Sequence, residues 1–574
     1  MATNPLLAGW NNKNYDNFIL KAILLNWEPE EVKHVNDLII KQGVRGWEIP
    51  GLNGRYIPIR SFDLKDDTQV GLSLKSVEGH LKMDIEEEGV DFDLDRPMTP
   101  EEVERTIFYC KHDVDATEEI FNIRRSYLEN KLYLGTLCNL EPERALYMTN
   151  AKLTAAYLGA ARPIQERSDE RNYELPGKLL IEWIPEEVKE FFGRLKDRSI
   201  PDEQVFSEKC NITIGDCPVT IGYGGIHGAI PNYTEKSSDK RTIRNQDVAS
   251  YYPHLMTLMG YCSRNIPDAE LYAKTLETRV KAKREGDKEK ANALKLVLNT
   301  TYGAMLNRYN NLYDPLMGRS VCISGQLFLL ELAEHLYTEC DSLRIIQVNT
   351  DGIMVSFDLV DEERYYEICK EWQQRTGFEL EEDRIKKIIQ KDVNNYIEVP
   401  EQGTPKIKGG DLVRGIAPAG AFNINNNAEV ISQAVYNYFV HGYPVQKTVD
   451  ETEDILAYQL IAKASGKYSE VYQVVMGEKV PVQRCNRVYA TDNLTFGTLY
   501  KVHKETGQVS KVPSLPLHCL IDNRNTLSIE DIDRSWYVRQ AEKIINNFLG
   551  KKEPKKNTRK INKIKREGLA LLGE

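Results

Sequence analysis

The stretch 345–357, IIQVNTDGIMVSF, consists of two apolar runs joined by Asn349-Thr350-Asp351-Gly352. Apolar runs on either side of an Asn- and Gly-containing turn predict a β-hairpin, because these residues tolerate the positive φ that tight turns demand. Asp351 is the one carboxylate in this apolar setting. It is either a turn residue or a metal ligand at the tip of a buried hairpin, and the rest of the sequence decides between the two.

The composition is that of an ordinary soluble protein. The 574 residues include 41% hydrophobic and 28% charged residues, and this length predicts two to four domains. No run of about 20 apolar residues occurs, and the N-terminus lacks the basic and apolar parts of a secretion signal. We therefore expect no membrane association and a cytoplasmic location.

Charge and cysteine usage narrow the class further. The net charge of −11 argues against a basic coat, although basic residues cluster in the segment 551–567. This segment is either a solvated helix end or an arm that contacts phosphates. The ten cysteines are scattered without a CxxC pattern, so the sequence predicts neither a zinc site nor a disulfide framework.

Two helices are predicted over 267–285 and 288–306. The dipeptide Gly286-Asp287 between them predicts an antiparallel helical hairpin. Another helix is predicted over 322–340, directly before the β-hairpin.

The second helix carries Lys295, Asn299 and Tyr302 at i, i+4 and i+7, on one face. This face is either a solvated surface or a binding surface, and the following Gly303 permits close approach of another backbone or a base pair. Pairing the two helices about their turn places Arg279 roughly opposite Lys295. Converging cations need an anion, and a triphosphate is a good candidate.

A second carboxylate, Asp247, ends a predicted strand in the segment DVASYYP (247–253). Alone, this segment is typical of a strand that runs into a turn. If the fold brings Asp247 to Asp351, the two carboxylates repel each other unless a cation neutralises them. Mg²⁺ suits this role, and two such ions roughly 4 Å apart would serve an in-line phosphoryl transfer.

Three segments in order, DVASYYP, KLVLNTTYG (295–303) and NTDG (349–352), resemble motifs A, B and C of the family B DNA polymerases. This resemblance implies a template-directed DNA polymerase that acts on a primed DNA template and dNTPs. The short spacing between motifs A and B favours an ordinary nucleic-acid primer over a protein primer. The alternative is a non-catalytic DNA-binding remnant of such a polymerase.

Two further segments lie where the family has conserved motifs. Tyr223-Gly224-Gly225 in IGYGGIHG resembles the YxGG segment between the exonuclease and polymerase domains. Lys406 and Lys408 in KIKGG resemble the motif that holds the primer end. Two apart on a strand, these lysines share one face, where they would meet phosphates; a solvated edge strand is the other interpretation.

The resemblance also implies roles in catalysis. Asp247 and Asp351 would bind two Mg²⁺ ions, for which Mn²⁺ is a substitute, with the backbone carbonyl of Val248 as a further ligand. Tyr252 would be a steric gate whose ring lies under the sugar and excludes a 2′-hydroxyl. Most relatives carry Asp-Thr-Asp in motif C, so Asn349 is a departure that offers a carbonyl oxygen without negative charge.

The incoming nucleotide would be held by the helical hairpin. Its cations would contact the triphosphate, and a phenol and a glycine would pack against the nascent base pair. The residues assigned to this side of the site are Lys295, Asn299, Arg279, Lys283, Tyr302 and Gly303.

The first 125 residues resemble the 3′–5′ exonuclease domain of the same family. NNKNYDNF resembles its second motif through Asn12 and Asp16, and YCKHDVDAT resembles the third through Tyr109 and Asp113. The first motif, an Asp-x-Glu that should stand several dozen residues before NNKNYD, is missing, so we expect little or no proofreading by this chain alone.

Two explanations of this gap are open. In one, the polymerase is split and a separately encoded N-terminal exonuclease fragment supplies the missing strands. In the other, the chain is a truncated, prophage-like remnant; a start codon assigned too far downstream would look the same. The resemblance to compact phage-type members implies the cytoplasm of a bacterial host.

The expected fold is α/β and multidomain, with an incomplete RNase H-like exonuclease domain followed by a right-hand polymerase. The palm would hold an antiparallel sheet and the fingers a helical hairpin. The expected divisions are a partial exonuclease-like domain (1–125), a linking region with the YxGG segment (126–245), the palm (246–266 and 307–415), the fingers (267–306), and a thumb with the basic tail (416–574).

Overall fold

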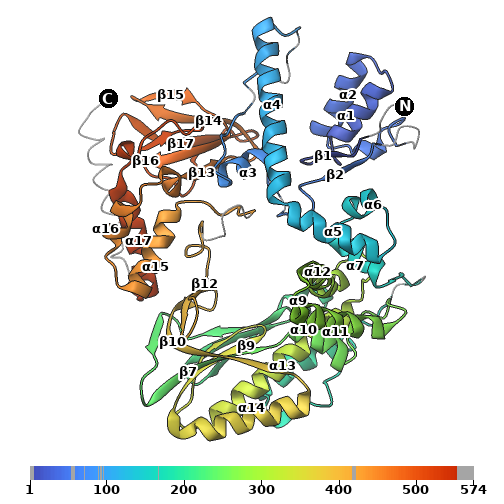
Figure 1. The fold of residues 1–574 in the computed structure, drawn as a ribbon, viewed down its shortest axis with the longest axis vertical. Coiled ribbons are helices and arrows are strands. Elements are labelled where there is room, and N and C mark those ends of the chain that lie inside the picture. Colours follow the sequence, from blue (N-terminus) through green and yellow to red (C-terminus); the bar gives the residue numbers. More distant parts are fainter. Residues whose placement is uncertain are drawn as a thin grey trace.

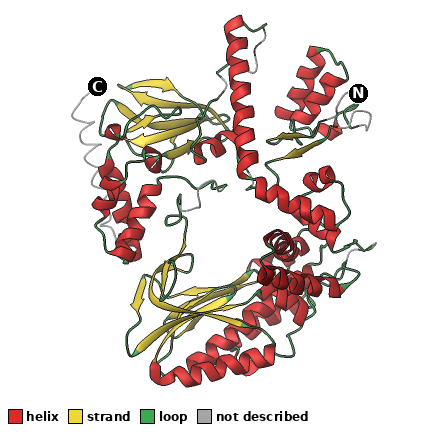
Figure 2. Cartoon of the chain, viewed as in Figure 1, coloured by secondary structure: helices red, strands yellow, loops and turns green. Residues whose placement is uncertain are grey.

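The computed structural model describes residues 5–53, 59–69, 71–87, 89–90, 94, 96–163, 165, 167–415 and 422–551. Figure 1 shows an N-terminal region with the long helix α4, a central sheet backed by helices, and a C-terminal region with two smaller sheets. Helices and strands mix throughout (Figure 2), so the α/β multidomain class is confirmed. The ten cysteines all lie in the described part of the chain and are free.

The central sheet is antiparallel and has ten strands in the order β12-β11-β10-β7-β9-β8-β5-β4-β3, with β6 paired to β10. Its strands are β3 (Lys209–Ile214), β4 (Cys217–Gly222), β5 (Gly225–Ala229), β6 (Tyr233–Lys236), β7 (Arg241–Val248), β8 (Arg344–Val348), β9 (Gly352–Asp358), β10 (Leu380–Asp392), β11 (Asn395–Pro400) and β12 (Lys406–Lys408). The sheet thus begins inside the segment 126–245 that was expected to be a linking region.

Helices α13 (Pro315–Glu339) and α14 (Glu362–Thr376) cover one face of this sheet (Figure 1). α13 begins before the predicted residue 322 because its first turns are buried too, and Ser320 donates its buried hydroxyl to the carbonyl oxygen of Leu316 (2.8 Å). In the described part of the chain, α13 alone is long and apolar enough to cross a membrane, but 89% of its apolar window is buried inside the protein. Such burial is typical of a core helix.

The predicted helical hairpin is present as α11 (Ala269–Glu285) and α12 (Lys288–Met305). Gly286 ends α11 with a φ of +77°, a conformation that glycine adopts without strain. Asp287 then caps α12, because its side chain accepts a hydrogen bond from the backbone N–H of Lys290. α12 packs against two earlier helices, α5 (Arg125–Leu137) and α7 (Asn150–Tyr157).

The N-terminal region holds a parallel pair of short strands and several helices. β1 and β2 pair from Leu7↔Ser61 to Gly9↔Asp63. An RNase H-like arrangement of this region remains a prediction. Its elements, with the helices that lead into the central sheet, are β1 (Leu7–Gly9), α1 (Asp16–Leu24), α2 (Pro29–Ile40), β2 (Ser61–Asp63), α3 (Leu74–His80), α4 (Pro100–Ile123), α6 (Pro142–Tyr147), α8 (Glu186–Gly193) and α9 (Asp202–Ser207). A further helix, α10 (Tyr251–Leu258), follows β7 directly.

The C-terminal region has its own hydrophobic core and is fastened to the segment after α3. The fully buried guanidinium of Arg487 donates to the side chains of Gln459 and Asn525 and to the backbone carbonyl of Met83. The elements of this region are α15 (Glu429–His441), α16 (Val445–Glu451), β13 (Leu460–Lys463), β14 (Tyr468–Val475), β15 (Glu478–Pro481), β16 (Cys485–Ala490), β17 (Phe496–His503), β18 (Val509–Lys511), β19 (Cys519–Ile521) and α17 (Arg534–Phe548). The basic segment 551–567 lies outside the described residues apart from Lys551.

Candidate active site

The structure brings Asp247 and Asp351 together at one edge of the central sheet. Asp247 is the penultimate residue of β7 and pairs with Gly352, the first residue of β9. The backbone N–H of Val248 donates to the carbonyl oxygen of Asp351 at 2.7 Å, which ties the hairpin tip to the end of β7. The carboxylate of Asp351 is exposed at this tip, whereas that of Asp247 is partly buried.

The hairpin turn forms without the positive φ that the sequence argument assumed. Neither Asn349, Asp351 nor Gly352 is among the residues of positive φ, and the turn closes with Asn349 N–H donating to the carbonyl of Gly352 at 2.8 Å. Gly352 is needed for another reason. A Cβ there would overlap the carboxylate of Asp247 and lie 2.7 Å from the carbonyl oxygen of Gln246, so only glycine lets β9 approach β7 this closely.

A cavity of about 220 Å³ lies between the two carboxylates and the neighbouring strands β11 and β12. Both predicted lysines line it, Lys406 and Lys408, together with Asn349. The ammonium of Lys408 lies 5.9 Å from the ring centre of Tyr396, and Lys406 pairs with Asp383. The sheet thus places Asp247, Asp351 and two lysines around one hollow.

Glu398 is a residue of this cavity that the sequence analysis missed. Its side chain is only 2% exposed, one carboxylate oxygen has no hydrogen-bond partner, and the Lys406 ammonium lies 3.8 Å from it. Burial raises the pKa of Glu398 to about 7. Glu398 pairs with Lys406 across β11 and β12, and this register is not visible in the sequence.

Burial and the neighbouring charge of Asp351 raise the pKa of Asp247 to about 6. The pKa of Lys406 is also raised: its burial acts in the opposite direction, but Asp383 and Glu398 outweigh it. A buried acid beside a like charge is destabilised when ionised, and it gains from any cation that enters the cavity.

The side chains of Tyr252 and Tyr302 contact each other, although they lie on different helices, α10 and α12. Their ring centres are 4.7 Å apart in an edge-to-face arrangement. Ser250, between Asp247 and Tyr252, has a φ of +47° and starts α10. Arg279 reaches this turn, with Nη1 3.5 Å from the Ser250 hydroxyl.

The exposed face of α12 carries the remaining residues of the nucleotide prediction. Lys295, Asn299 and Gly303 are exposed, as is Lys283 on α11. A Cβ at Gly303 would meet no atom within 4 Å, so packing within the chain does not require glycine there. The face is free to receive a ligand, although its contact with one stays a prediction.

The segment Tyr223-Gly224-Gly225 lies next to the hairpin, but its tyrosine points inward. Tyr223 is 8% exposed and packs against Phe191 in the core, so contact between its side chain and DNA would require rearrangement. Gly224 is exposed, and a Cβ on Gly225 would lie 3.8 Å from the Thr350 hydroxyl. The exposed part of this segment is therefore backbone.

A second acidic cluster lies in the N-terminal region. Asn12, Asp16 and Asp113 line a largely apolar cavity of about 810 Å³. The ammonium of Lys75 pairs with Asp113 and also with Glu78. The pKa of Asp16 is raised by burial and by its acidic neighbours, among them Asp113.

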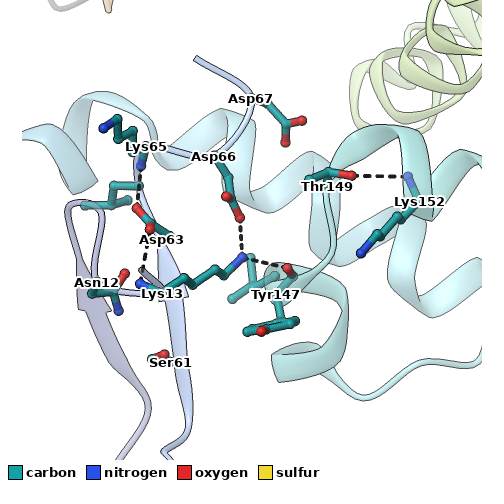
Figure 3. A network of polar contacts seen from close by, with 12 residues as sticks. Asn12, Lys13, Ser61, Asp63, Lys65, Asp66, Asp67, Tyr147, Thr149 and Lys152 are labelled. Carbon is teal, nitrogen blue, oxygen red and sulfur yellow. Dashed lines mark hydrogen bonds and ion pairs between the residues drawn. The ribbon is translucent and has the colours of Figure 1, made fainter. Parts of the chain in front are cut away.

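The loop between β1 and α1 is held by ion pairs and hydrogen bonds (Figure 3). The carboxylate of Asp63 accepts from the backbone N–H groups of Asn11 (2.8 Å) and Lys65 (2.9 Å). Lys13 pairs with Asp66 and donates to the carbonyl of Tyr147 at 2.6 Å.

Tyr109 lies beside the same lysine that pairs with Asp113. The Lys75 ammonium is 4.7 Å from the ring centre of Tyr109. The four residues of the exonuclease resemblance, Asn12, Asp16, Tyr109 and Asp113, therefore fall in one neighbourhood in which a lysine already supplies positive charge.

In the described part of the chain, no group of three or more His, Cys, Asp or Glu side chains has the geometry to hold a metal ion. A site formed by Asp247 and Asp351 would thus have two carboxylates and would need further oxygens from substrate or water. Mg²⁺ sites in phosphoryl-transfer enzymes are commonly of this kind.

No protein-family model and no curated protein matches this sequence. Among solved structures, the family B DNA polymerase of the hyperthermophilic archaeon Pyrobaculum calidifontis aligns over 96% of this chain and 70% of its own, with a TM-score of 0.39 and 12% identity.

Replacing Asp247 with Asn should stabilise the metal-free protein at pH 8. The folded pKa of about 6 exceeds the ordinary value of 3.8, so ionised Asp247 costs stability fully above about pH 6 and not below about pH 4. The gain should approach about 3 kcal/mol at pH 8 and vanish towards pH 4. Thermal unfolding in EDTA across this pH range measures it. A gain independent of pH, or one equal to that of the exposed control Asp216→Asn, would contradict this account.

Gly352→Ala should lower the thermal stability, by roughly 1–3 kcal/mol, because the added methyl overlaps Asp247 and forces β9 away from β7. Gly222→Ala is the matched control on β4, since its Cβ would lie 3.8 Å from the nearest atom. Equal unfolding temperatures for the two variants would show that the close approach is unimportant.

Proposed function

We propose that this chain is a template-directed DNA polymerase that adds dNTPs to the 3′ end of a primer. The observation that carries the proposal is the convergence of Asp247 from β7, Asp351 from the β8–β9 turn, and Lys406 and Lys408 from β12 on one cavity. Carboxylates at the end of a sheet with cations beside them suit a reaction that handles phosphates and metal ions. In this proposal the central sheet is the palm and α11–α12 the fingers.

The donor set of the cavity fits Mg²⁺. Among the cavity residues, Asp247 and Asp351 offer hard oxygen ligands and Asn349 an amide oxygen. The backbone carbonyl of Val248, next to Asp247 in the chain, would be a further ligand. The pKa of Asp247 is raised by its burial and by the charge of Asp351, so the site favours an entering cation. When bound, two Mg²⁺ ions would activate the primer 3′-hydroxyl and neutralise the charge that develops on the phosphates. Mn²⁺ is a substitute with the same ligand preference.

On the nucleotide side, the cations of the hairpin would bind the triphosphate and the tyrosines would shape the sugar pocket. Lys295 and Lys283 are exposed, and Nη1 of Arg279 lies 3.5 Å from the hydroxyl of Ser250, three residues after Asp247. Tyr252 would exclude a 2′-hydroxyl by the position of its ring. Asn299, Tyr302 and Gly303 would face the base pair.

On the primer side, Lys406 and Lys408 would hold the primer end. Lys406 is anchored by Asp383, which orients its ammonium, and Lys408 lies over Tyr396. The exposed backbone at Gly224 would give the DNA a surface free of side chains. The C-terminal region would take the role of a thumb.

The alternative, a non-catalytic DNA-binding remnant, predicts binding without extension. A separately encoded N-terminal fragment would be a further partner if the polymerase is split. We infer a cytoplasmic site of action, in a bacterial host if the gene belongs to a phage.

Primer extension decides between polymerase and remnant. With a primed template, dNTPs and Mg²⁺, the wild-type chain should extend the primer. Asp351→Asn should reduce the rate by at least about a hundredfold, because it removes a negatively charged carboxylate that would bind the metal ions. Asp341→Asn, an exposed acid before β8, is the matched control and should retain full activity. DNA binding without extension by the wild type would favour the remnant.

A single-stranded oligonucleotide with Mg²⁺ should keep its length when incubated with this chain. Lys75 already pairs with Asp113, and a fixed ammonium at that carboxylate opposes the binding of a divalent cation. Gel analysis of 3′-end loss over hours measures this, with Asp113→Asn as the reference. Shortening by the wild type that Asp113→Asn abolishes would overturn the expectation.

A further inference from the structure

One buried thiol connects the segments that surround the candidate sugar pocket. Cys322, on α13, is 1% exposed. Its sulfur lies 2.7 Å from the Tyr302 hydroxyl, 3.4 Å from the Tyr252 hydroxyl and 3.4 Å from the carbonyl oxygen of Gly224. A single side chain thus meets α10, α12 and the turn between β4 and β5.

The hydrogen bonds of this cluster can be assigned consistently. Burial raises the pKa of Cys322 and of both tyrosines, so all three groups are neutral at pH 7. The Cys322 S–H donates to the carbonyl oxygen of Gly224, which has no proton to give. The sulfur then accepts hydrogen bonds from the two tyrosine hydroxyls through its lone pairs, so each hydroxyl has a partner.

The position of the Tyr252 ring depends on this arrangement. Its hydroxyl bonds to the thiol, and its ring edge contacts Tyr302, whose hydroxyl is fixed on the same sulfur. Because α13 is buried almost along its whole length, Cys322 is a rigid anchor. A change at the sulfur moves two aromatic rings together.

We propose that Cys322 is a positioning residue that fixes Tyr252 and Tyr302 and thereby sets the discrimination between dNTPs and rNTPs. The proposal rests on the proposed polymerase function and on the gate role of Tyr252. Cys322 touches neither substrate nor metal ion in this account. It acts by holding the gate ring at one height under the sugar.

The cluster predicts an order among substitutions. Cys322→Val keeps a similar volume but offers no acceptor, so both hydroxyls lose their partner. Cys322→Ser keeps an acceptor and a donor in a smaller atom, so it should restore part of the wild-type behaviour. Cys340→Ala is the matched control, because Cys340 is equally buried and directly follows α13, far along the helix from the tyrosines.

The test measures incorporation of single dNTPs and rNTPs on a primed template, and kcat and KM separately. Cys322→Val should reduce the discrimination ratio by about fivefold to tenfold, mainly by improving KM for rNTPs, because the hydrogen bond that holds the Tyr252 ring is worth about that factor. Cys322→Ser should fall between Val and the wild type, and Cys340→Ala should match the wild type. Tyr252→Ala should admit rNTPs most readily, and Cys322→Val should add nothing to it.

The positioning role of Cys322 and the polymerase activity can fail separately, with different results. If the wild type extends primers and Cys322→Val discriminates as the wild type does, Cys322 has no positioning role while the polymerase stands. If the wild type does not extend primers, the preference is measured as equilibrium binding. A dNTP or an rNTP is then titrated into the complex of the protein with a template and a dideoxy-terminated primer. Equal preference of the wild type and Cys322→Val in that assay overturns the proposal, and a reduced preference in Cys322→Val supports it.

Discussion

The repulsion between Asp247 and Asp351 is the constraint on which the candidate site depends. Hydrogen bonds between β7 and β9 hold these like charges together, including the bond from Val248 to the carbonyl of Asp351. The sheet can impose this because Gly352 leaves no Cβ between the strands. Folding of the whole sheet thus offsets a local cost, and the pKa of Asp247 is raised first by burial and then by the charge of Asp351. A cation that binds in the cavity would remove that cost. The electrostatic repulsion that destabilises the metal-free protein would therefore favour cation binding.

The positive charges near Asp247 and Asp351 neutralise this pair only in part. The Lys406 ammonium forms ion pairs with Asp383 and Glu398, and the side chain of Asp351 stays exposed. If a lysine sat directly on both aspartates, it would close the site to metal ions. The cluster of Tyr252, Tyr302 and Cys322 is held together by ring and hydroxyl contacts and adds no charge. The charged residues of the cavity thus come from the sheet, whereas the tyrosine and cysteine side chains come from helices. Cys322 lies on α13, which is buried along most of its length.

Local patterns in the sequence predicted the two hairpins well. The breaks at Gly286-Asp287 and at Asn349-Gly352 fall where the structure has them, because turn chemistry is local. The reason assumed for the second turn was wrong, since its residues avoid positive φ and Gly352 serves strand contact instead. Glu398, Cys322 and the inward position of Tyr223 were not predicted. Each depends on strand register or helix packing between distant segments, and a single sequence does not record such pairings.

The two acidic clusters of this chain show why one of them is the better candidate for a metal-dependent reaction. In the N-terminal region, the negative charge of Asp113 is met by the ammonium of Lys75, which also binds the buried Glu78. Internal pairing of this kind satisfies the carboxylate and leaves little to be gained from an external cation. At the central sheet, no lysine pairs directly with Asp247 or Asp351 among the described residues, and the cavity stays open between them. An unbalanced carboxylate pair is retained at a cost in stability, and a ligand that binds there offsets this cost. The unbalanced pair is therefore the more informative feature, although both clusters are rich in acidic residues.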